Sequence, residues 1–147
     1  MRKGKKRAIT GFGVFLGFTL IFAIFFYLNF TTIQVSGISM AKTLKNGQRV
    51  LVSKAYWLVG SIKDQDIVVI KDPEGPGDII KRVIWMAGEE VDVDHRPEGI
   101  PLNPNGKYIV PEDCIYVMGD NRPMSEDSRK FGPVSTDKIV GKVIVYR

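Results

Sequence analysis

The hydrophobic positions of this chain follow two different patterns, which meet near residue 30. From Ala8 to Phe30 the sequence has no charged residue and is almost wholly apolar. Beyond Phe30 the apolar residues occur in short runs rich in β-branched side chains, separated by Gly, Pro, Asn and Asp. A continuous apolar stretch predicts one long helix, whereas short runs between turn formers predict strands. We therefore expect an N-terminal helix followed by a domain that is mostly β.

One of the predicted strands presents a lysine to an apolar face. The predicted strands cover residues 32–35, 49–53, 67–70, 79–85, 90–93, 108–110, 115–118 and 140–145. Alternation along 79–85 puts Lys81 on the same face as Ile79 and Val83, with Arg82 on the opposite face. Apolar neighbours lower the pKa of a lysine because burial disfavours the charged form. The alternative for this residue taken alone is a lysine that reaches solvent at an exposed edge.

The uncharged N-terminal stretch is long enough to cross a bilayer. Roughly 22 helical residues span about 33 Å, against a hydrocarbon core of about 30 Å. The alternative, a cleaved signal peptide, has an apolar region of about 7–15 residues and then a small-x-small site. This stretch is longer and ends in Asn29-Phe30-Thr31-Thr32. We expect a basic tail over 1–7, an uncleaved transmembrane anchor over 8–30 and a single domain over 31–147, because about 115 residues make one domain.

The positive charge of the chain is concentrated before this anchor. The net charge is +5 and the pI is about 9.4, and residues 1–7 hold Arg2, Lys3, Lys5, Lys6 and Arg7 with no acid. The 21 basic residues less these five leave 16, equal to the 16 acidic residues. The domain therefore has no basic excess with which to bind nucleic acid. Basic residues before a spanning segment stay in the cytoplasm, so we expect the domain outside the cytoplasmic membrane, with the lipid bilayer as a partner.

The chain has one cysteine and one histidine, which limits its chemistry. Cys114 cannot form an intramolecular disulfide, and in its strand-like run we expect an inert, half-buried thiol. His95 lies among polar turn residues, where we expect a solvated side chain. These two residues do not make a zinc set, and a Ser-His-Asp triad would need its histidine in a different kind of segment. We therefore expect no metal and no cofactor.

Three polar segments carry the candidate chemistry. They are Ser36-Gly37-Ile38-Ser39-Met40, Lys81-Arg82-Val83-Ile84, and the run GDNRPMSEDSR from Gly119 to Arg129. A serine hydroxyl needs only a neighbour that takes its proton, and a desolvated amine does this near neutral pH. Ser39 and Lys81 are therefore candidates for a nucleophile and its base. The third segment is dense in turn formers, which predicts a structured loop that holds other groups in place.

These segments, in this order behind an apolar N-terminus, make the chain resemble the type I signal peptidases of bacteria. The resemblance runs from about Ile33 to Arg129. SGISMAKTL is similar to that family's nucleophile segment, KRVI to its base-lysine segment, and GDNRPMSEDSR to the segment that orients the lysine. The third segment is the most specific. The chain departs from the usual family residues at Lys42, Gln65 and Ala87-Gly88-Glu89.

The resemblance implies an all-β catalytic domain in which Ser39 and Lys81 cleave signal peptides from exported preproteins. The substrate would add as a strand between residues about 32–39 and 78–81, and Ser125 would hydrogen-bond the Lys81 ammonium. Some members complete the oxyanion hole with a hydroxyl at the position of Gly37. Here we expect backbone N–H groups of the segment Gly37 to Met40, that of Ser39 included, to bind the oxyanion. The residues expected to pair and fix the loop are Arg82, Asp120, Asn121, Arg122, Asp127 and Arg129.

Other interpretations share parts of this pattern. A signal-peptidase-like assembly factor would bind surface subunits such as pilins without cutting them, but the presence of both Ser39 and Lys81 disfavours it. A self-cleaving Ser/Lys repressor of similar fold is disfavoured by the anchor and by the lack of a DNA-binding module. For Trp57 and Trp85 the sequence leaves two placements open. Each packs in the core or lies at the bilayer interface, where tryptophan is favoured.

Overall fold

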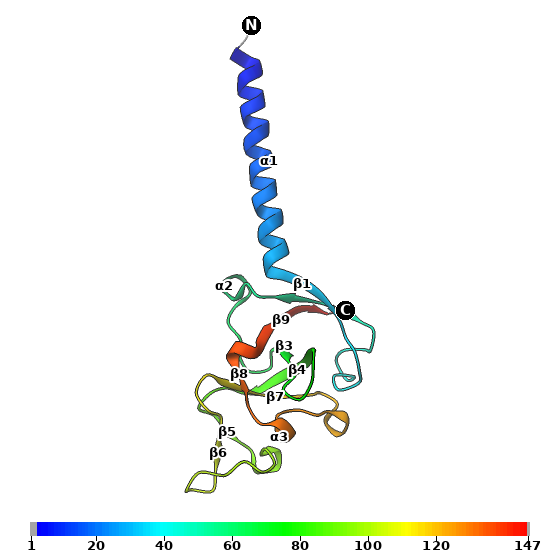
Figure 1. Ribbon diagram of the computed structural model, residues 1–147, viewed down its shortest axis with the longest axis vertical. Coiled ribbons are helices and arrows are strands. Elements are labelled where there is room, and N and C mark those ends of the chain that lie inside the picture. Colours follow the sequence, from blue (N-terminus) through cyan, green and yellow to red (C-terminus); the bar gives the residue numbers. More distant parts are fainter. Residues whose placement is uncertain (1–2, 147) are drawn as a thin grey trace.

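The structure of the chain is a computed structural model that describes residues 3–146, with side chains described for 11–144. One long helix extends away from a domain built mainly of strands (Figure 1). In chain order the elements are α1 (Lys3–Asn29), β1 (Phe30–Gln34), β2 (Arg49–Ser53), α2 (Tyr56–Val59), β3 (Ile67–Lys71), β4 (Asp78–Trp85), β5 (Glu90–Val91), β6 (Tyr108–Ile109), β7 (Cys114–Met118), α3 (Ser128–Phe131), β8 (Val134–Ser135) and β9 (Ile139–Tyr146), with single 3₁₀ turns at Val93–His95, Arg122–Met124 and Thr136–Lys138. The prediction of a helix followed by a mostly β domain is confirmed.

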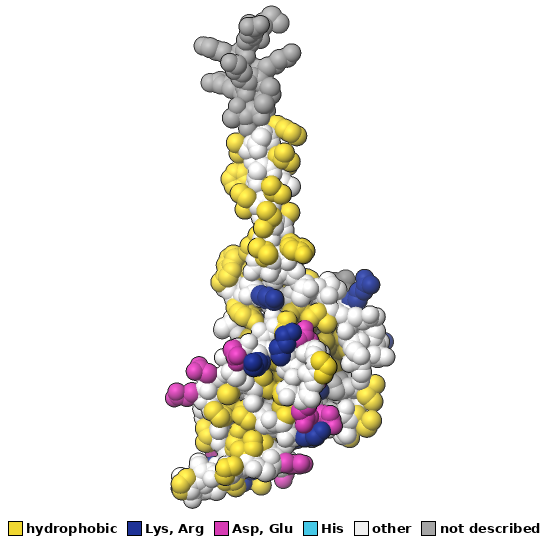
Figure 2. Space-filling view, viewed as in Figure 1, with side chains coloured by type: hydrophobic (Ala, Val, Ile, Leu, Met, Phe, Trp, Pro, Cys, Tyr) yellow, Lys and Arg dark blue, Asp and Glu magenta, His cyan; other side chains and the backbone are white. Residues whose placement is uncertain are grey.

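The helix α1 has the composition of a membrane span. Its segment Gly11–Asn29 is 19 residues long with a mean hydropathy of 2.2, and none of it is buried against the domain. Apolar side chains cover it on the face seen in Figure 2. The apolar stretch was expected to stay helical to Phe30, but α1 ends at Asn29 because Phe30 already pairs with Ser53 as the first residue of β1.

The main sheet is antiparallel and strongly curled. Its strand order is β1-β2-β9-β3-β4-β7-β8, and β5 and β6 form a separate pair. The pairing register shifts between Leu51 and Val52, between Val69 and Ile70, and between Val83 and Trp85. Such bulges bend strands and increase their twist. As a result β1 and the start of β4 line one cavity, although three strands separate them in the sheet.

One predicted strand is wrong over half of its length. Residues 90–93 were expected to be extended, but β5 contains only Glu90 and Val91. The chain then turns, with the His95 N–H donating to the Asp92 carbonyl at 3.0 Å, and Val93 begins a 3₁₀ turn. Asp is a residue that favours turns over strand continuation, so the alternation of Val and Asp here did not indicate a longer strand.

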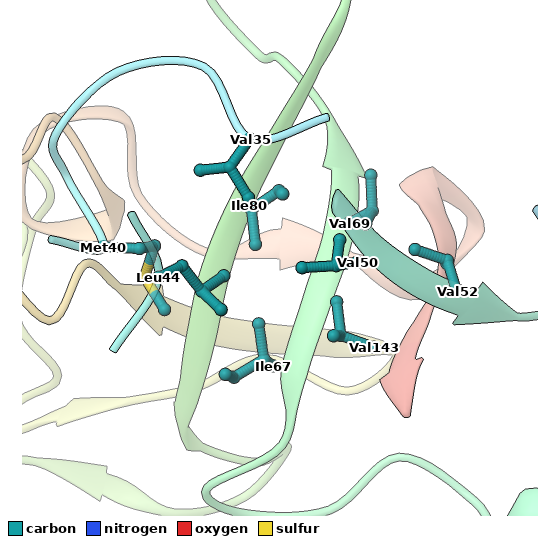
Figure 3. Close-up of a cluster of buried hydrophobic side chains, with 9 residues drawn as sticks. All are labelled: Val35, Met40, Leu44, Val50, Val52, Ile67, Val69, Ile80 and Val143. Carbon is teal, nitrogen blue, oxygen red and sulfur yellow. The ribbon is translucent and has the colours of Figure 1, made fainter. Parts of the chain in front are cut away.

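Strand β3 is the centre of the core because both of its faces are covered. Ile67 and Val69 belong to the cluster in Figure 3, whereas Val68 and Ile70 pack on the other face with residues of β4, β7 and β8. The cluster in Figure 3 also contains Met40 and Leu44, which come from the loop after β1 and are 2% and 0% exposed. Burying side chains of this size stabilises by about 1.5–3 kcal/mol each. The core therefore holds the loop that carries Ser39 against the sheet.

Candidate active site

Ser39 and Lys81 open onto the same cleft. A cavity of about 490 Å³ is lined by both residues, together with Gly37, Ile38 and Ile79. A smaller cavity of about 80 Å³ is also lined by Ser39 and Lys81, and it continues along β1 and the first residues of β4. The structure therefore brings two of the three predicted segments to one place, although 42 positions separate the two residues in the sequence.

The loop that carries Ser39 is held at both ends. Gly37 has φ of +90°, a conformation that L-residues rarely adopt, and its N–H donates to the Asn46 Oδ1 at 3.0 Å. On the other side of Ser39, the Leu44 N–H donates to the Met40 carbonyl at 2.7 Å, and both side chains are buried. Ser39 itself is half-buried. Ser39 therefore lines the cleft while its backbone is fixed.

Only some of the backbone N–H groups near Ser39 are free to bind a substrate oxygen. The Gly37 N–H was expected among the groups that support the oxyanion, but it is already engaged by Asn46. Within residues 3–146, the N–H groups of Ser39 and Met40 have no hydrogen-bond acceptor. An oxyanion hole needs N–H groups that stay free until charge develops on the substrate oxygen. Ser39 and Met40 are thus the backbone donors that can serve an oxyanion.

Lys81 is a buried amine with a hydroxyl as its nearest polar partner. The residue is 4% exposed, and its Nζ donates to the Ser125 Oγ at 3.2 Å. Among the described residues no carboxylate lies within 4.0 Å of this Nζ. Burial lowers the pKa of Lys81 below its usual value, and this outweighs the opposing attraction of Asp127, Asp72 and Glu126. The amine is therefore closer to its neutral, proton-accepting form than a solvated lysine.

Ser125 connects Lys81 to a buried carboxylate. Asp127 is 0% exposed in its side chain and accepts hydrogen bonds from the Arg129 Nε at 2.8 Å and from the Gly119 N–H at 3.1 Å. Burial acts to raise the pKa of Asp127, but the hydrogen bonds from Arg129, Ser125 and Gly119 outweigh it and hold the pKa below its usual value. A charged Asp127 that accepts the Ser125 proton leaves the oxygen lone pairs of Ser125 for Lys81.

Arg82 makes a separate ion pair on the opposite face of β4. Its Nε and Nη2 donate to the two carboxylate oxygens of Asp120 at 2.8 and 2.7 Å, and its Nη1 donates to the Gln65 carbonyl at 2.8 Å. Thr43, on the Ser39 loop, also donates to Asp120. Burial acts to raise the pKa of Asp120, but these partners lower it below its usual value. The Arg82–Asp120 pair thus joins β4 to the loop from Gly119 to Arg129, and Thr43 adds the loop that carries Ser39.

The loop from Gly119 to Arg129 also touches the Ser39 segment directly. The Asn121 N–H donates to the Ser39 carbonyl at 2.8 Å, and its Nδ2 donates to the Ile38 carbonyl at 3.0 Å. Arg122 was expected to pair with an acid, but within residues 3–146 it makes no ion pair. Its Nη1 instead lies 3.1 Å from the Met118 sulfur, and its carbonyl accepts from Arg129. Arg122 therefore supports the loop through its backbone.

His95 and Cys114 lie away from the cleft. Cys114 is half-buried at the start of β7, as expected, and burial raises the pKa of its thiol. The expectation of a solvated His95 is wrong, because its side chain is 34% exposed and its ring lies 5.7 Å from that of Trp85. Trp85 packs in turn on Tyr116 at 5.5 Å, so it belongs to the core. Neither His95 nor Cys114 lines the two described cavities that Ser39 lines.

Comparison with known proteins decides the family. The family model described as signal peptidase, peptidase S26, matches residues 7–103 and 98–146. The chain belongs to this signal peptidase family. It is 31% identical to signal peptidase I U of Bacillus subtilis over 165 residues, covering 95% of this chain and 87% of the relative. It is 36% identical to signal peptidase I of Bacillus caldolyticus over 140 residues, covering 78% of this chain and 77% of the relative.

A solved structure is also similar. It is the crystal structure of a signal peptidase I from Enterococcus faecalis, with a TM-score of 0.44 and 26% identity. The match covers 58% of this chain and 97% of that one. The resemblance to signal peptidases noted from the three polar segments is thus confirmed by the family model and by the two Bacillus relatives.

Three contacts that support the site of this signal peptidase family member were not predicted from its sequence. Thr43 bonds to Asp120, the carbonyl of Gln65 accepts from Arg82, and Gly119 lies where the Ser39 and Ser125 segments meet. Gln65, one of the departures from the usual family residues, has φ of +67°, the left-handed region in which glycine is favoured. The hydrogen bond from Arg82 to the Gln65 carbonyl holds that conformation.

Replacing Gly119 with alanine should disable the cleft of this signal peptidase family member. A Cβ on residue 119 would lie 2.6 Å from the Ser39 carbonyl and would collide with the Ser125 hydroxyl. Displacing catalytic groups by about 1 Å costs on the order of 100-fold in rate, so we expect a loss of that size in kcat/KM for preprotein. The loss in kcat/KM should be larger than any fall in the fraction of folded protein at the assay temperature.

Gly141→Ala is the matched control for this substitution. Its Cβ would crowd the Val52 Cγ1 at 2.6 Å and the Ser53 carbonyl at 2.9 Å, and it lies on β9, away from the cleft. Overpacking of this kind costs about 1–3 kcal/mol of stability. Gly141→Ala should thus lower the melting temperature without lowering the activity of folded molecules. Equal activity losses in the two variants would show that Gly119 has only a structural role.

Proposed function

We propose that this chain is a membrane-anchored serine endopeptidase that removes signal peptides from exported preproteins. The observation that carries the proposal is the buried amine of Lys81, which has no carboxylate at ion-pair distance among the described residues and shares a cleft with Ser39. Desolvation is the means by which a lysine becomes a base near neutral pH. Family membership supports the choice of a signal peptide as substrate.

The proposed reaction has two halves. Neutral Lys81 takes the proton of the Ser39 hydroxyl, and the Ser39 oxygen attacks the scissile carbonyl carbon. The oxyanion is held by the N–H groups of Ser39 and Met40, and Lys81 returns the proton to the departing amine as the peptide bond breaks. Lys81 then takes a proton from water, which attacks the ester carbonyl carbon. Lys81 returns this proton to the Ser39 oxygen as the ester bond breaks and the signal peptide is released. Ser125 keeps the Lys81 amine directed into the cleft.

The cleft suits an extended peptide with small side chains. Strand β1 is an edge of the sheet, and the small cavity runs between Ile33–Gly37 of the β1 side and Asp78–Lys81 of β4. An extended peptide can add to such an edge through main-chain hydrogen bonds, with pockets for alternate side chains. A cavity of about 80 Å³ next to Ser39 admits alanine or glycine and excludes a phenyl ring. We propose that this cavity selects small residues before the cut.

The proposed location is the cytoplasmic membrane, crossed once. The 19-residue segment Gly11–Asn29 has the length and hydropathy of a span. Five basic residues precede it in the sequence, which favours a cytoplasmic N-terminus and a domain outside. Exported preproteins emerge on that side, so the cleft and its substrates would meet there.

The direct test is cleavage of a preprotein by the full chain in detergent. We expect a new N-terminus at the end of the signal peptide, identified by sequencing, and no cleavage by Ser39→Ala. A preprotein with Phe in place of Ala at the residue before the cut should remain intact. Binding of preprotein or of surface subunits without any cleavage would instead identify an assembly factor, and equal cutting of the Phe substrate would contradict the role of the small cavity.

A further inference from the structure

The larger cavity of the cleft continues past Ser39 on the side away from the small cavity. The two cavities share Gly37, Ser39, Ile79 and Lys81. From these residues the small cavity follows β1 back to Ile33, whereas the larger one reaches the loop between β3 and β4 and the loop from Gly119 to Arg129. When the small cavity holds the residues before the cut, a peptide extended past Ser39 places the residues after the cut in the larger cavity. This step rests on the proposed function.

Carboxylates from two loops line the larger cavity. Asp72 and Glu74 come from the loop between β3 and β4, and Glu126 follows Ser125 in the other loop. The Asp72 Oδ1 accepts the Glu74 N–H at 3.0 Å. Among residues 11–144, whose side chains are described, no basic group lies within 4.0 Å of the Asp72 carboxylate. A peptide in this cavity therefore meets negative charge from both loops.

Lys130 neutralises only part of this charge. Its Nζ lies 2.8 Å from the Glu126 carboxylate and 3.3 Å from the Glu74 carboxylate, so it joins the two loops. One ammonium against three carboxylates leaves the cavity with an excess of negative charge. In the described part of the chain these acids do not form a group that could hold a metal ion. Their charge is therefore available to the peptide.

The charge of the two loops reaches the reacting groups. Burial lowers the pKa of Lys81, and the attraction of Asp127, Asp72 and Glu126 acts against this effect. Asp127 is held in its own pair with Arg129, but Asp72 and Glu126 line the cavity itself. A charged side chain next to the scissile bond therefore interacts with Asp72 and Glu126 across the same space.

Apolar surface lies beside these carboxylates. Met124 is 59% exposed and Ile38 is 48% exposed, and both line the larger cavity. A lysine or arginine side chain can lay its apolar stem on such a surface and keep its charged end beside a carboxylate. An aspartate or glutamate side chain would instead bring a like charge toward Asp72 and Glu126.

We propose that Asp72 and Glu126 determine specificity for the residues after the cut, so that lysine or arginine is favoured over aspartate or glutamate among the first two residues of the mature chain. Neighbouring residues of an extended peptide point to opposite faces, so one of these two side chains faces the carboxylates. The small cavity thus selects by size before the cut, and the larger cavity selects by charge after it.

The test uses preproteins that share one signal peptide, with Ala before the cut and with Lys, Gln or Glu at the first or the second position after it. The full chain in detergent is assayed for kcat/KM at low ionic strength. At one of the two positions we expect Lys to exceed Glu about fivefold, with Gln between them, a size typical of exposed charge pairs. In about 1 M salt the ratio should approach one, because screening then acts within about 3 Å.

The ratio of kcat/KM for the Lys and Glu preproteins is also the measure for each enzyme variant. A change in folding or in the pKa of Lys81 affects both substrates alike and cancels in this ratio. Glu126→Gln and Asp72→Asn should each lower the ratio, and the double variant should bring it close to one, since Lys130 then neutralises Glu74. Glu126→Lys should favour the Glu preprotein.

Glu112→Gln is the matched control. Glu112 is exposed, precedes β7 and does not line the larger cavity, so its replacement removes the same charge elsewhere on the domain. The ratio should be that of the unmodified chain.

The outcomes separate charge selection from the function on which it rests. Equal kcat/KM for the Lys and Glu preproteins at both positions overturns the proposal and leaves the peptidase function intact. A preference that persists in the double variant, or that Glu112→Gln lowers as much as Glu126→Gln does, overturns the role of Asp72 and Glu126. No cleavage of any of the preproteins overturns the proposed function, and this inference with it.

Discussion

Replacing Lys81 with methionine should lower preprotein cleavage by about 10⁴-fold or more, because groups that act as one nucleophile-and-base unit lose nearly all of their effect when either is removed. Methionine has a similar shape and is compatible with the apolar neighbours of Lys81, so the domain should remain folded. The measurements are kcat/KM and the melting temperature. Substantial activity in a folded Lys81→Met variant would rule out Lys81 as the base.

The pH dependence of the unmodified chain tests the same role. Burial lowers the pKa of Lys81, and only the neutral amine accepts the Ser39 proton, so activity should rise as the pH climbs through that lowered pKa. Below it, the ammonium form predominates and cleavage should fall. Lys81→Arg should be inactive at every pH because a guanidinium stays protonated. A rate that is independent of pH between 6 and 10, or an active Lys81→Arg, would contradict the mechanism.

Lys142 provides the matched control for Lys81. It is also a buried lysine on a central strand, but its Nζ lies 2.7 Å from the Asp66 carboxylate. Lys142→Met should destabilise the domain, since it leaves Asp66 without its partner, while the folded fraction keeps the pH profile of the unmodified chain. The comparison distinguishes the loss of a buried lysine from the loss of the proposed base.

Strand alternation was sufficient to predict the faces of β4. It put Lys81 with Ile79 and Val83, and in the structure Lys81 and Val83 are buried while Arg82 pairs with Asp120 on the other side. The same reasoning applied to residues 140–145 would have singled out Lys142 between Val140 and Ile144. Periodicity predicts that both lysines are buried. It does not predict which of them has a carboxylate beside its amine. That depends on Asp66, which is 76 positions away in the sequence.

The parts of the site that depend on long-range approach could not be predicted. Nothing in the sequence around Gly119 shows that the Ser39 carbonyl lies where a side chain at position 119 would be. Asn46, which takes the Gly37 N–H, is one polar residue among several in its loop. His95 looked solvated because its sequence neighbours are polar, yet Trp85 from β4 covers its ring. Local composition predicts local conformation, whereas these contacts are made by the curl of the sheet.

Replacing Asp127 with asparagine should destabilise the domain by about 3 kcal/mol, because it removes the negative partner of Arg129 inside a buried network. The folded-state pKa of Asp127 is lower than its unfolded value of about 3.9. Its contribution is therefore complete above that unfolded value and is lost as the pH falls through the folded pKa. Denaturant titrations from pH 7 to pH 2 should show this acid-side loss in the unmodified chain and a smaller one in Asp127→Asn.

The same substitution should move the pH profile of activity. The negative charge of Asp127 raises the pKa of Lys81, so its removal should shift the rising limb of the profile to lower pH. Asp120→Asn is the control, since it breaks the buried pair with Arg82 on the opposite face of β4 and should destabilise the domain without that shift. If Asp127→Asn and Asp120→Asn lower stability alike and neither moves the profile, Asp127 supports only the fold, and the link through Ser125 to Lys81 has no part in tuning the base.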